Sequence, residues 1–274
     1  MAIMASLCLV FGTLAIMGGN YINKNPLYIK RLNAAIEDNN YSEVQSLLEL
    51  PHHGNIDGVP SLFPFLHLLI KEKIVYSPLE NACRNANINI ISLLIKNGAN
   101  VNGDEKKGLG REAYSPLMLA VMAGGDDRLE IIKLLVENGA DLDYSYGGQL
   151  AITLTAETNF YDSTQVLEYL ESVGQKIEVM YPRGSLLHYA CYGGNSRTIQ
   201  YLIETKYLYI NEKDINGRTP LICFSFPVKE KNLEDLIYLL NNGADKTIVD
   251  NEGKTAYDYA SSSNTPSFLQ LIKP

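Results

Sequence analysis

A short pattern that returns several times along the chain constrains its fold more than any other feature. Residues 97–102 read NGANVN, residues 138–143 read NGADLD, and residues 242–245 read NGAD. Each copy follows an apolar stretch with the spacing of a helix that buries one side. Such recurrence predicts a stack of small helical units, each of which buries its apolar face only against its neighbours.

The second helix of each unit is predicted from adjacent apolar pairs. They occur in residues 90–95 (IISLLI), 131–136 (IIKLLV) and 236–240 (LIYLL). We expect these pairs to fall on one buried stripe.

A hydroxyl residue at the start of a second apolar pattern predicts where the first helix of each unit begins. The four starts are Ser77-Pro78, Ser115-Pro116, Ser185-Leu186 and Thr219-Pro220. The serine or threonine side chain caps the helix, and proline suits its first turn.

These units resemble the ankyrin repeat, whose TPLHxAA start, glycine turn, leucine-rich second helix and GADVN end map onto the positions above. The resemblance covers roughly residues 32–272 and implies an all-α ankyrin-repeat solenoid of about seven helix–turn–helix units with β-hairpin fingers. The units are residues 32–50, 76–102, 114–143, 146–177, 181–211, 214–248 and 250–272. The fourth departs most, because Leu150-Ala151-Ile152-Thr153 replaces the starting motif, and Asn39 replaces the turn glycine of the first.

Composition favours a folded chain with a protein partner. Of 274 residues, 46% are hydrophobic and 20% charged, which is ordinary for a globular protein or solenoid. The net charge of −8 argues against nucleic acid as the partner, since phosphate binding needs a cationic surface. A basic protein partner is favoured.

Residues 1–23 carry no charge and are predicted to be a signal peptide or membrane anchor, followed by an ankyrin-repeat domain at 24–274. The apolar run is at the lower limit of the length that spans a membrane. A typical signal peptide has a Lys or Arg before its apolar run, and this chain has none there. A buried helix of the first repeat stays open as an alternative. The expected location is the cell envelope, periplasmic or membrane-anchored, or the cytoplasm if translation starts at Met17.

No cofactor, metal or catalytic site is predicted. The loop from Gly103 to Gly108 lacks the Lys-Ser/Thr of a nucleotide loop, and the adjacent His52 and His53 lack the further ligands of a metal site. His188 matches the ankyrin histidine that satisfies backbone groups. The chain is therefore predicted not to be an enzyme; the enzyme alternative would depend on Glu157 or the pair Asp126-Asp127.

Free buried thiols are predicted for the cysteines of the repeats. Cys83 and Cys191 lie in units far apart, and even neighbouring units are separated by about 10 Å, whereas a disulfide needs Cα atoms within about 7 Å. Cys223, one unit beyond Cys191, has a different helical position.

The resemblance also implies a binding face, because ankyrin arrays bind through finger tips and the solvent-facing positions of the first helix. The implied partner-binding residues are Tyr76, Arg84, Tyr114, Met122, Tyr146, Gln149, Glu157, Tyr181, Tyr192 and Arg218. Tyrosine is enriched at binding hot spots. We therefore expect Tyr114, Tyr146, Tyr181 and Tyr192 to form the centre of the contact.

Two segments depart from the repeat length. Residues 51–75 form an insertion with an apolar stretch, predicted to pack as an extra helix or to dock a partner, and residues 103–112 form a long charged hairpin. The predicted function is a monomeric protein–protein interaction module, either an immunity protein that inhibits a bacterial toxin or, alternatively, a secreted effector or scaffold that docks host proteins.

Overall fold

The computed structural model describes residues 26–50, 56, 76–103, 114–160, 162–206, 209–226, 232–261 and 266–274. Three predictions lie outside these residues: the export segment 1–23, the insertion 51–75 apart from the buried Ile56, and the charged hairpin after Gly103. No helix in the described ranges combines the length and the apolar character that crossing a membrane requires.

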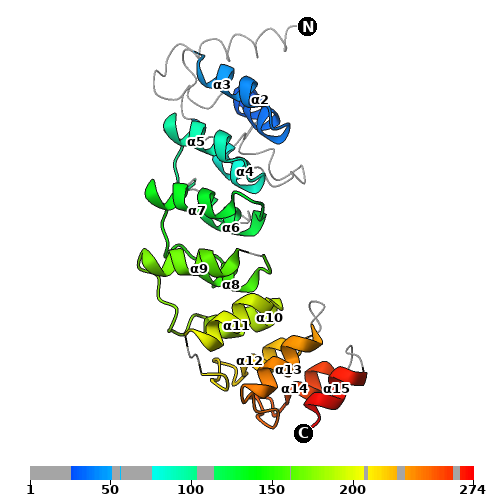
Figure 1. The fold of residues 1–274 in the computed structure, drawn as a ribbon. Coiled ribbons are helices and arrows are strands. Elements are labelled where there is room, and N and C mark those ends of the chain that lie inside the picture. Colours follow the sequence, from blue (N-terminus) through cyan, green and yellow to red (C-terminus); the bar gives the residue numbers. More distant parts are fainter. Residues whose placement is uncertain are drawn as a thin grey trace, which may run out of the picture. The chain divides into compact units, whose positions relative to one another are not determined.

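The described residues form helices in seven consecutive pairs (Figure 1). The pairs are α2 (Pro26–Glu37) with α3 (Tyr41–Leu48), α4 (Pro78–Arg84) with α5 (Ile88–Lys96), α6 (Pro116–Ala123) with α7 (Arg128–Glu137), α8 (Ala151–Glu157) with α9 (Ser163–Ser172), α10 (Leu186–Gly193) with α11 (Ser196–Glu204), α12 (Pro220–Phe224) with α13 (Leu233–Asn241), and α14 (Ala256–Ala260) with α15 (Pro266–Ile272). The predicted all-α array of seven helix–turn–helix units is confirmed. The first helix begins at Pro26, earlier than the predicted start at residue 32, because the buried positions Ile29 and Leu32 extend its apolar face towards the N-terminus.

The chain divides into two compact units. Unit 1 comprises Met1–Leu119 and Glu137–Ala140, and unit 2 comprises Ala120–Val136 and Asp141–Pro274. Within unit 1, α4 packs on α2 and α5 packs on α3. Within unit 2, α10 packs between α8 and α12, α12 contacts α14, and α11 contacts α9. First helices therefore stack on first helices and second helices on second helices.

The predicted helix starts are confirmed by their hydrogen bonds. The backbone N–H of Glu80 donates to Ser77 Oγ at 3.3 Å, and the backbone N–H of Ile222 donates to Thr219 Oγ1 at 3.3 Å. The fourth unit lacks a hydroxyl at this position, and there the backbone N–H of Leu150 donates to Thr153 Oγ1 at 2.8 Å. This bond satisfies the N–H of Leu150, as Glu80 does for Ser77, but no side chain caps the first turn of α8.

The apolar stripe of the second helices is narrower than predicted. Leu94, Leu135 and Leu239 are buried as expected. Ile237, however, leaves 41% of its surface exposed, so the prediction that both members of each pair are buried was wrong there. Adjacent side chains on a helix point about 100° apart. The neighbouring repeats therefore bury one member of such a pair more fully than the other where their contact with the second helix is narrow.

The fingers that the structure describes between pairs are tight turns and not extended strands. In the described chain they show only isolated bridges, Tyr146 with Gln149 and Tyr181 with Gly184. Gly147 and Gly148 have φ of 59° and 77°, values that suit glycine at the tip of a two-residue hairpin.

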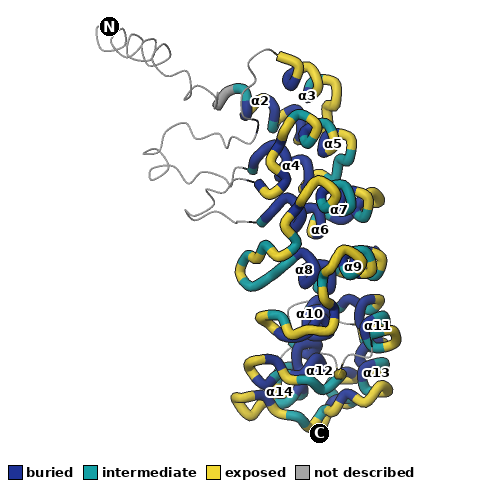
Figure 2. The backbone as a smooth tube through the Cα atoms, turned by 90° about the vertical axis from the view of Figure 1, so that its left-hand side faces the viewer, coloured by how far each residue is buried: buried dark blue, intermediate teal, exposed yellow. Residues whose placement is uncertain are grey.

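First and second helices differ in burial (Figure 2). In unit 2 nearly every residue of α8, α10 and α12 is buried, whereas α9, α11 and α13 alternate between buried and exposed residues. The side chains at the ends of the first helices and in the fingers are consequently the ones that can form a site on that face.

Candidate functional site

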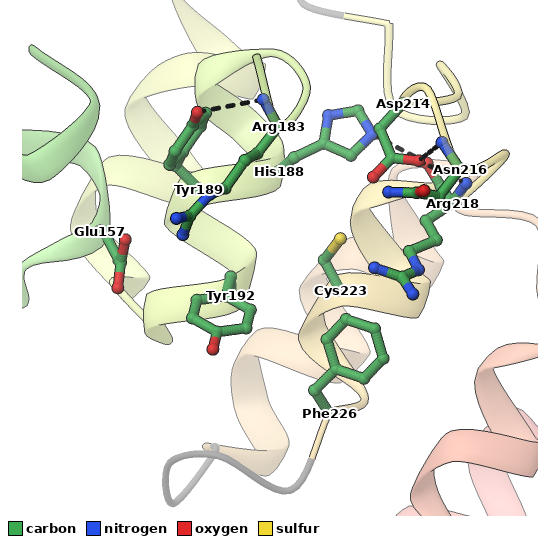
Figure 3. A pocket seen from close by; sticks show the side chains of 10 residues that line it. All are labelled: Glu157, Arg183, His188, Tyr189, Tyr192, Asp214, Asn216, Arg218, Cys223 and Phe226. Carbon is green, nitrogen blue, oxygen red and sulfur yellow. Dashed lines mark hydrogen bonds between the residues drawn. The ribbon is translucent and has the colours of Figure 1, made fainter. Parts of the chain in front are cut away.

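A cavity of about 350 Å³ lies in unit 2, between the fingers and the ends of three first helices (Figure 3). Its walls contain charged, aromatic and neutral polar side chains. The lining residues are Glu157, Arg183, His188, Tyr189, Tyr192, Asp214, Asn216, Arg218, Cys223 and Phe226.

Equivalent positions of three successive repeats contribute residues to the same wall of the cavity. Glu157, Tyr192 and Phe226 each stand six residues after the first residue of α8, α10 and α12, which are Ala151, Leu186 and Pro220. Because these first helices stack side by side, the equivalent positions form a row. Gly193 allows the close approach of α10 to α8, since a Cβ there would lie 1.9 Å from the backbone oxygen of Glu157.

Aromatic rings continue this row beyond the cavity. The rings of Tyr192 and Phe226 meet edge-on at 6.2 Å, and those of Phe226 and Tyr259 at 4.7 Å. The guanidinium of Arg218 lies 5.2 Å from the Phe226 ring centre and the ammonium of Lys254 lies 5.5 Å from that of Tyr259, both within cation–π range. We call Tyr192, Phe226 and Tyr259 the aromatic row.

Two aspartates hold the fingers that carry these cations. Asp214 Oδ1 accepts from the backbone N–H groups of Asn216 and Arg218, each at 2.8 Å. Asp250 Oδ1 accepts in the same way from Glu252 at 2.9 Å and from Lys254 at 3.0 Å. The same local geometry therefore presents Arg218 and Lys254 at equivalent places in successive fingers.

His188 joins the helix start to the next finger. Its Nδ1 accepts from the backbone N–H of Ser185 at 3.1 Å, so that Nε2 carries the proton and donates to the Arg218 carbonyl oxygen at 3.0 Å. Burial lowers the pKa of His188, which keeps the ring neutral. The structural role predicted for this histidine is confirmed, and a neutral ring held at both nitrogens is not poised for acid–base chemistry.

A family model described as "Ankyrin repeats (3 copies)" matches residues 21–146, 152–250 and 187–273. The chain belongs to the ankyrin-repeat family. The crystal structure of the human ASB11 ankyrin repeat domain aligns with a TM-score of 0.64 and 21% sequence identity, covering 89% of this chain and 97% of that domain. A search of the curated proteins found no match.

Ankyrin repeats are protein–protein interaction modules, and this chain is one by its family. Three of the residues implied by the ankyrin resemblance line the cavity: Glu157, Tyr192 and Arg218. Gln149 lies at its edge, where its amide nitrogen donates to Glu157 Oε2 at 2.9 Å.

The other implied residues of unit 2 lie away from the cavity walls. Tyr146 and Tyr181 are partly exposed at the bases of their fingers, and the Tyr181 hydroxyl donates to the carbonyl oxygen of Lys176. Burial, followed by the Asp143 carboxylate, raises the pKa of Tyr181 to about 12. Met122 stays exposed at the end of α6. The structure thus brings Tyr192 to the cavity and leaves Tyr146 and Tyr181 in the fingers.

Tyr76, Arg84 and Tyr114 belong to unit 1. The Arg84 guanidinium lies 4.2 Å from the centre of the Tyr76 ring, and Tyr114 is partly exposed. The cation–aromatic pairing of unit 2 therefore has a counterpart at the second repeat.

Phe226, Tyr189 and Arg183 were not identified from the sequence. Phe226 could have been found by counting, since it holds the register position of Tyr192 in the next repeat. No repeat position in the sequence indicates Arg183, because the conformation of the turn between Tyr181 and Gly184 determines where its side chain lies.

The cysteines and the acidic residues bear on the enzyme alternative. Cys83, Cys191 and Cys223 are buried free thiols, as predicted, and burial raises the pKa of Cys83 well above its usual value. Among the residues that the structure describes, no three potential metal ligands gather. Asp126 and Asp127 are exposed at the start of α7 and do not line the cavity.

Proposed function

We propose that the chain is a non-enzymatic module that binds a segment of a folded partner protein along the aromatic row and in the adjoining cavity. The observation that carries this proposal is the row itself: three rings from successive repeats, with a cation from a finger over two of them. Aromatic and arginine side chains contribute most of the energy at protein interfaces, especially where a pocket shields them from water.

A photo-crosslinker placed in the row tests the proposal. Phe226 is replaced by benzoylphenylalanine, which keeps an aromatic ring there, and the matched control carries it at Ile237, which is exposed on α13. On irradiation in native lysate we expect one discrete adduct from position 226 and none from position 237. Adducts from both positions alike, or from 237 alone, would contradict it.

The partner class separates the two narrower roles predicted from the sequence. Mass spectrometry of the adduct at position 226 would identify a bacterial toxin if the chain is an immunity protein, and a host protein if it is an effector.

Both narrower roles depend on the uncharged residues 1–23 acting as a signal or anchor. Fractionation of cells that express the full chain, and of cells that express a version starting at Met17, tests this part. Membrane or extracellular recovery of the full chain alone is the expected result. Recovery of both from the cytoplasm with intact N-termini would exclude it.

A further inference from the structure

We infer that the cavity takes an acidic side chain, an aspartate or glutamate of the partner segment, between Arg183 and Arg218. This inference deepens the proposed function and rests on it. It concerns only the charge of the group that enters the cavity, and the aromatic row supplies the apolar part of the same contact.

The first step concerns Arg218. Its Nε atom is buried and has no hydrogen-bond partner, and its nearest carboxylate oxygen, Asp250 Oδ2, is 3.9 Å away. Its guanidinium lies over Phe226 with 29% of the side chain exposed. In Figure 3 the guanidinium reaches past Cys223 towards the Phe226 ring. A buried guanidinium N–H without an acceptor is costly, and a ligand carboxylate would remove that cost.

The second step concerns Arg183, which lines the cavity together with Tyr189, on the far side from Arg218 in the view of Figure 3. Its Nη2 donates to the backbone oxygen of Gly147 at 2.9 Å, which is a neutral acceptor. No carboxylate among the described residues forms an ion pair with it. Its charge is therefore available to a ligand.

The third step concerns two acidic groups near Arg218: Asp214, which lines the cavity, and Asp250, which does not. Asp214 and Asp250 are both buried, and each directs Oδ1 at backbone N–H groups of its own turn. Asp250 Oδ2 also accepts from the Tyr259 hydroxyl at 2.6 Å. Both carboxylates thus have hydrogen-bond donors within their own fingers, and Asp250 also forms a long ion pair with Arg218.

Glu157 is the remaining acid of the cavity, and it bonds to the neutral amide of Gln149. The walls therefore carry two arginines and two carboxylates, and of the two arginines only Arg183 has no carboxylate partner among the described residues. The charge of Arg183 and the unsatisfied Nε–H of Arg218 are the features of the cavity that a carboxylate would complement. The net charge favours a basic partner as a whole, whereas Arg183 and the Nε–H of Arg218 favour an acidic side chain at the contact itself.

Selection of displayed random 12-residue peptides on the full chain tests the inference. Peptides that also bind the variant with Tyr192→Ala and Phe226→Ala are discarded, so that the remaining ones bind at the row. We expect these to share an aspartate or glutamate next to an apolar residue. If the peptides that depend on the aromatic row share no acidic residue, the inference is overturned and the proposed function still stands. If no selected peptide depends on the row, the proposed function itself fails.

Calorimetry on one selected peptide then examines the charge pairing. Arg218→Gln and the replacement of the peptide's acid by its amide should each weaken binding about 10-fold or more, and both together should weaken it little further, because they remove the same contact. Lys213→Gln is the matched control, since its exposed ammonium bonds to the Val249 carbonyl oxygen outside the cavity. Equal losses from Lys213→Gln and Arg218→Gln, or additive losses in the cycle, would overturn the inference.

Discussion

Arg128 and Asp162 form a buried ion pair in unit 2, with Arg128 Nη1 at 2.6 Å from Asp162 Oδ1. Arg128 is the first residue of α7, and Asp162 immediately precedes α9. The Arg128 Nε also donates to the Val121 carbonyl oxygen at 3.0 Å, and its guanidinium lies 4.7 Å from the Phe160 ring centre. One side chain thereby joins the third repeat to the fourth.

Removal of one partner from this pair should be strongly destabilising. Arg128→Met leaves the Asp162 carboxylate buried without its cation, and we expect the free energy of unfolding to fall by roughly 3–5 kcal/mol. Lys133→Met on the same helix is the control, because the Lys133–Glu130 pair is exposed and should contribute under about 1 kcal/mol. Chemical denaturation of both variants measures this. Equal losses of unfolding free energy in the two variants would contradict the prediction that the buried pair contributes more than the exposed one.

Gly193→Ala should destabilise unit 2, although the same change in an exposed helix usually stabilises by about 0.5–1 kcal/mol. The added Cβ would overlap the Glu157 backbone oxygen and force α10 away from α8. Such overpacking costs roughly 1–3 kcal/mol. The sign of the change in denaturation midpoint therefore decides whether the two helices approach as closely as described.

Stability should depend on His188 in mildly acidic solution. Its pKa is lowered in the folded protein, so between the unfolded value of about 6.5 and the folded value the unfolded state binds the proton and the folded state does not. Stability is then lost as the pH falls through this window, by at most about 1.4 kcal/mol per pH unit.

Denaturation of the parent and of His188→Asn at about pH 7, 6 and 5 isolates this contribution. The stability advantage of the parent should shrink as the pH falls, because asparagine does not titrate. Parallel pH profiles would show that His188 does not titrate differently in the two states.

The helix pairs could be predicted from the sequence because their signals are local. Ser77 and Thr219 cap the helices that directly follow them, and the stripe around Leu94 repeats within one helix. The exposed Ile237 could not be predicted, since its burial depends on how the neighbouring repeat packs.

Part of the candidate site could also be predicted, where register alone places a residue. Glu157 and Tyr192 follow from the register of the first helix, and Arg218 from its place before the capping Thr219. Arg183 and the pairing of Arg128 with Asp162 could not be predicted, because they join residues of different repeats through turns without a sequence signature. Tyr146 and Tyr181 form the isolated bridges at the bases of their fingers, and position in a finger alone does not say which way a ring turns.

The affinity of the partner captured at position 226 tests the central claim most directly. We predict that Tyr192→Ala combined with Phe226→Ala weakens binding by at least about 2 kcal/mol, the size of a hot-spot loss, with circular dichroism unchanged. Tyr146→Ala combined with Tyr181→Ala, in the fingers beside the cavity, should weaken it less. Calorimetry that gives the Tyr192/Phe226 variant the affinity of the parent protein would contradict the account.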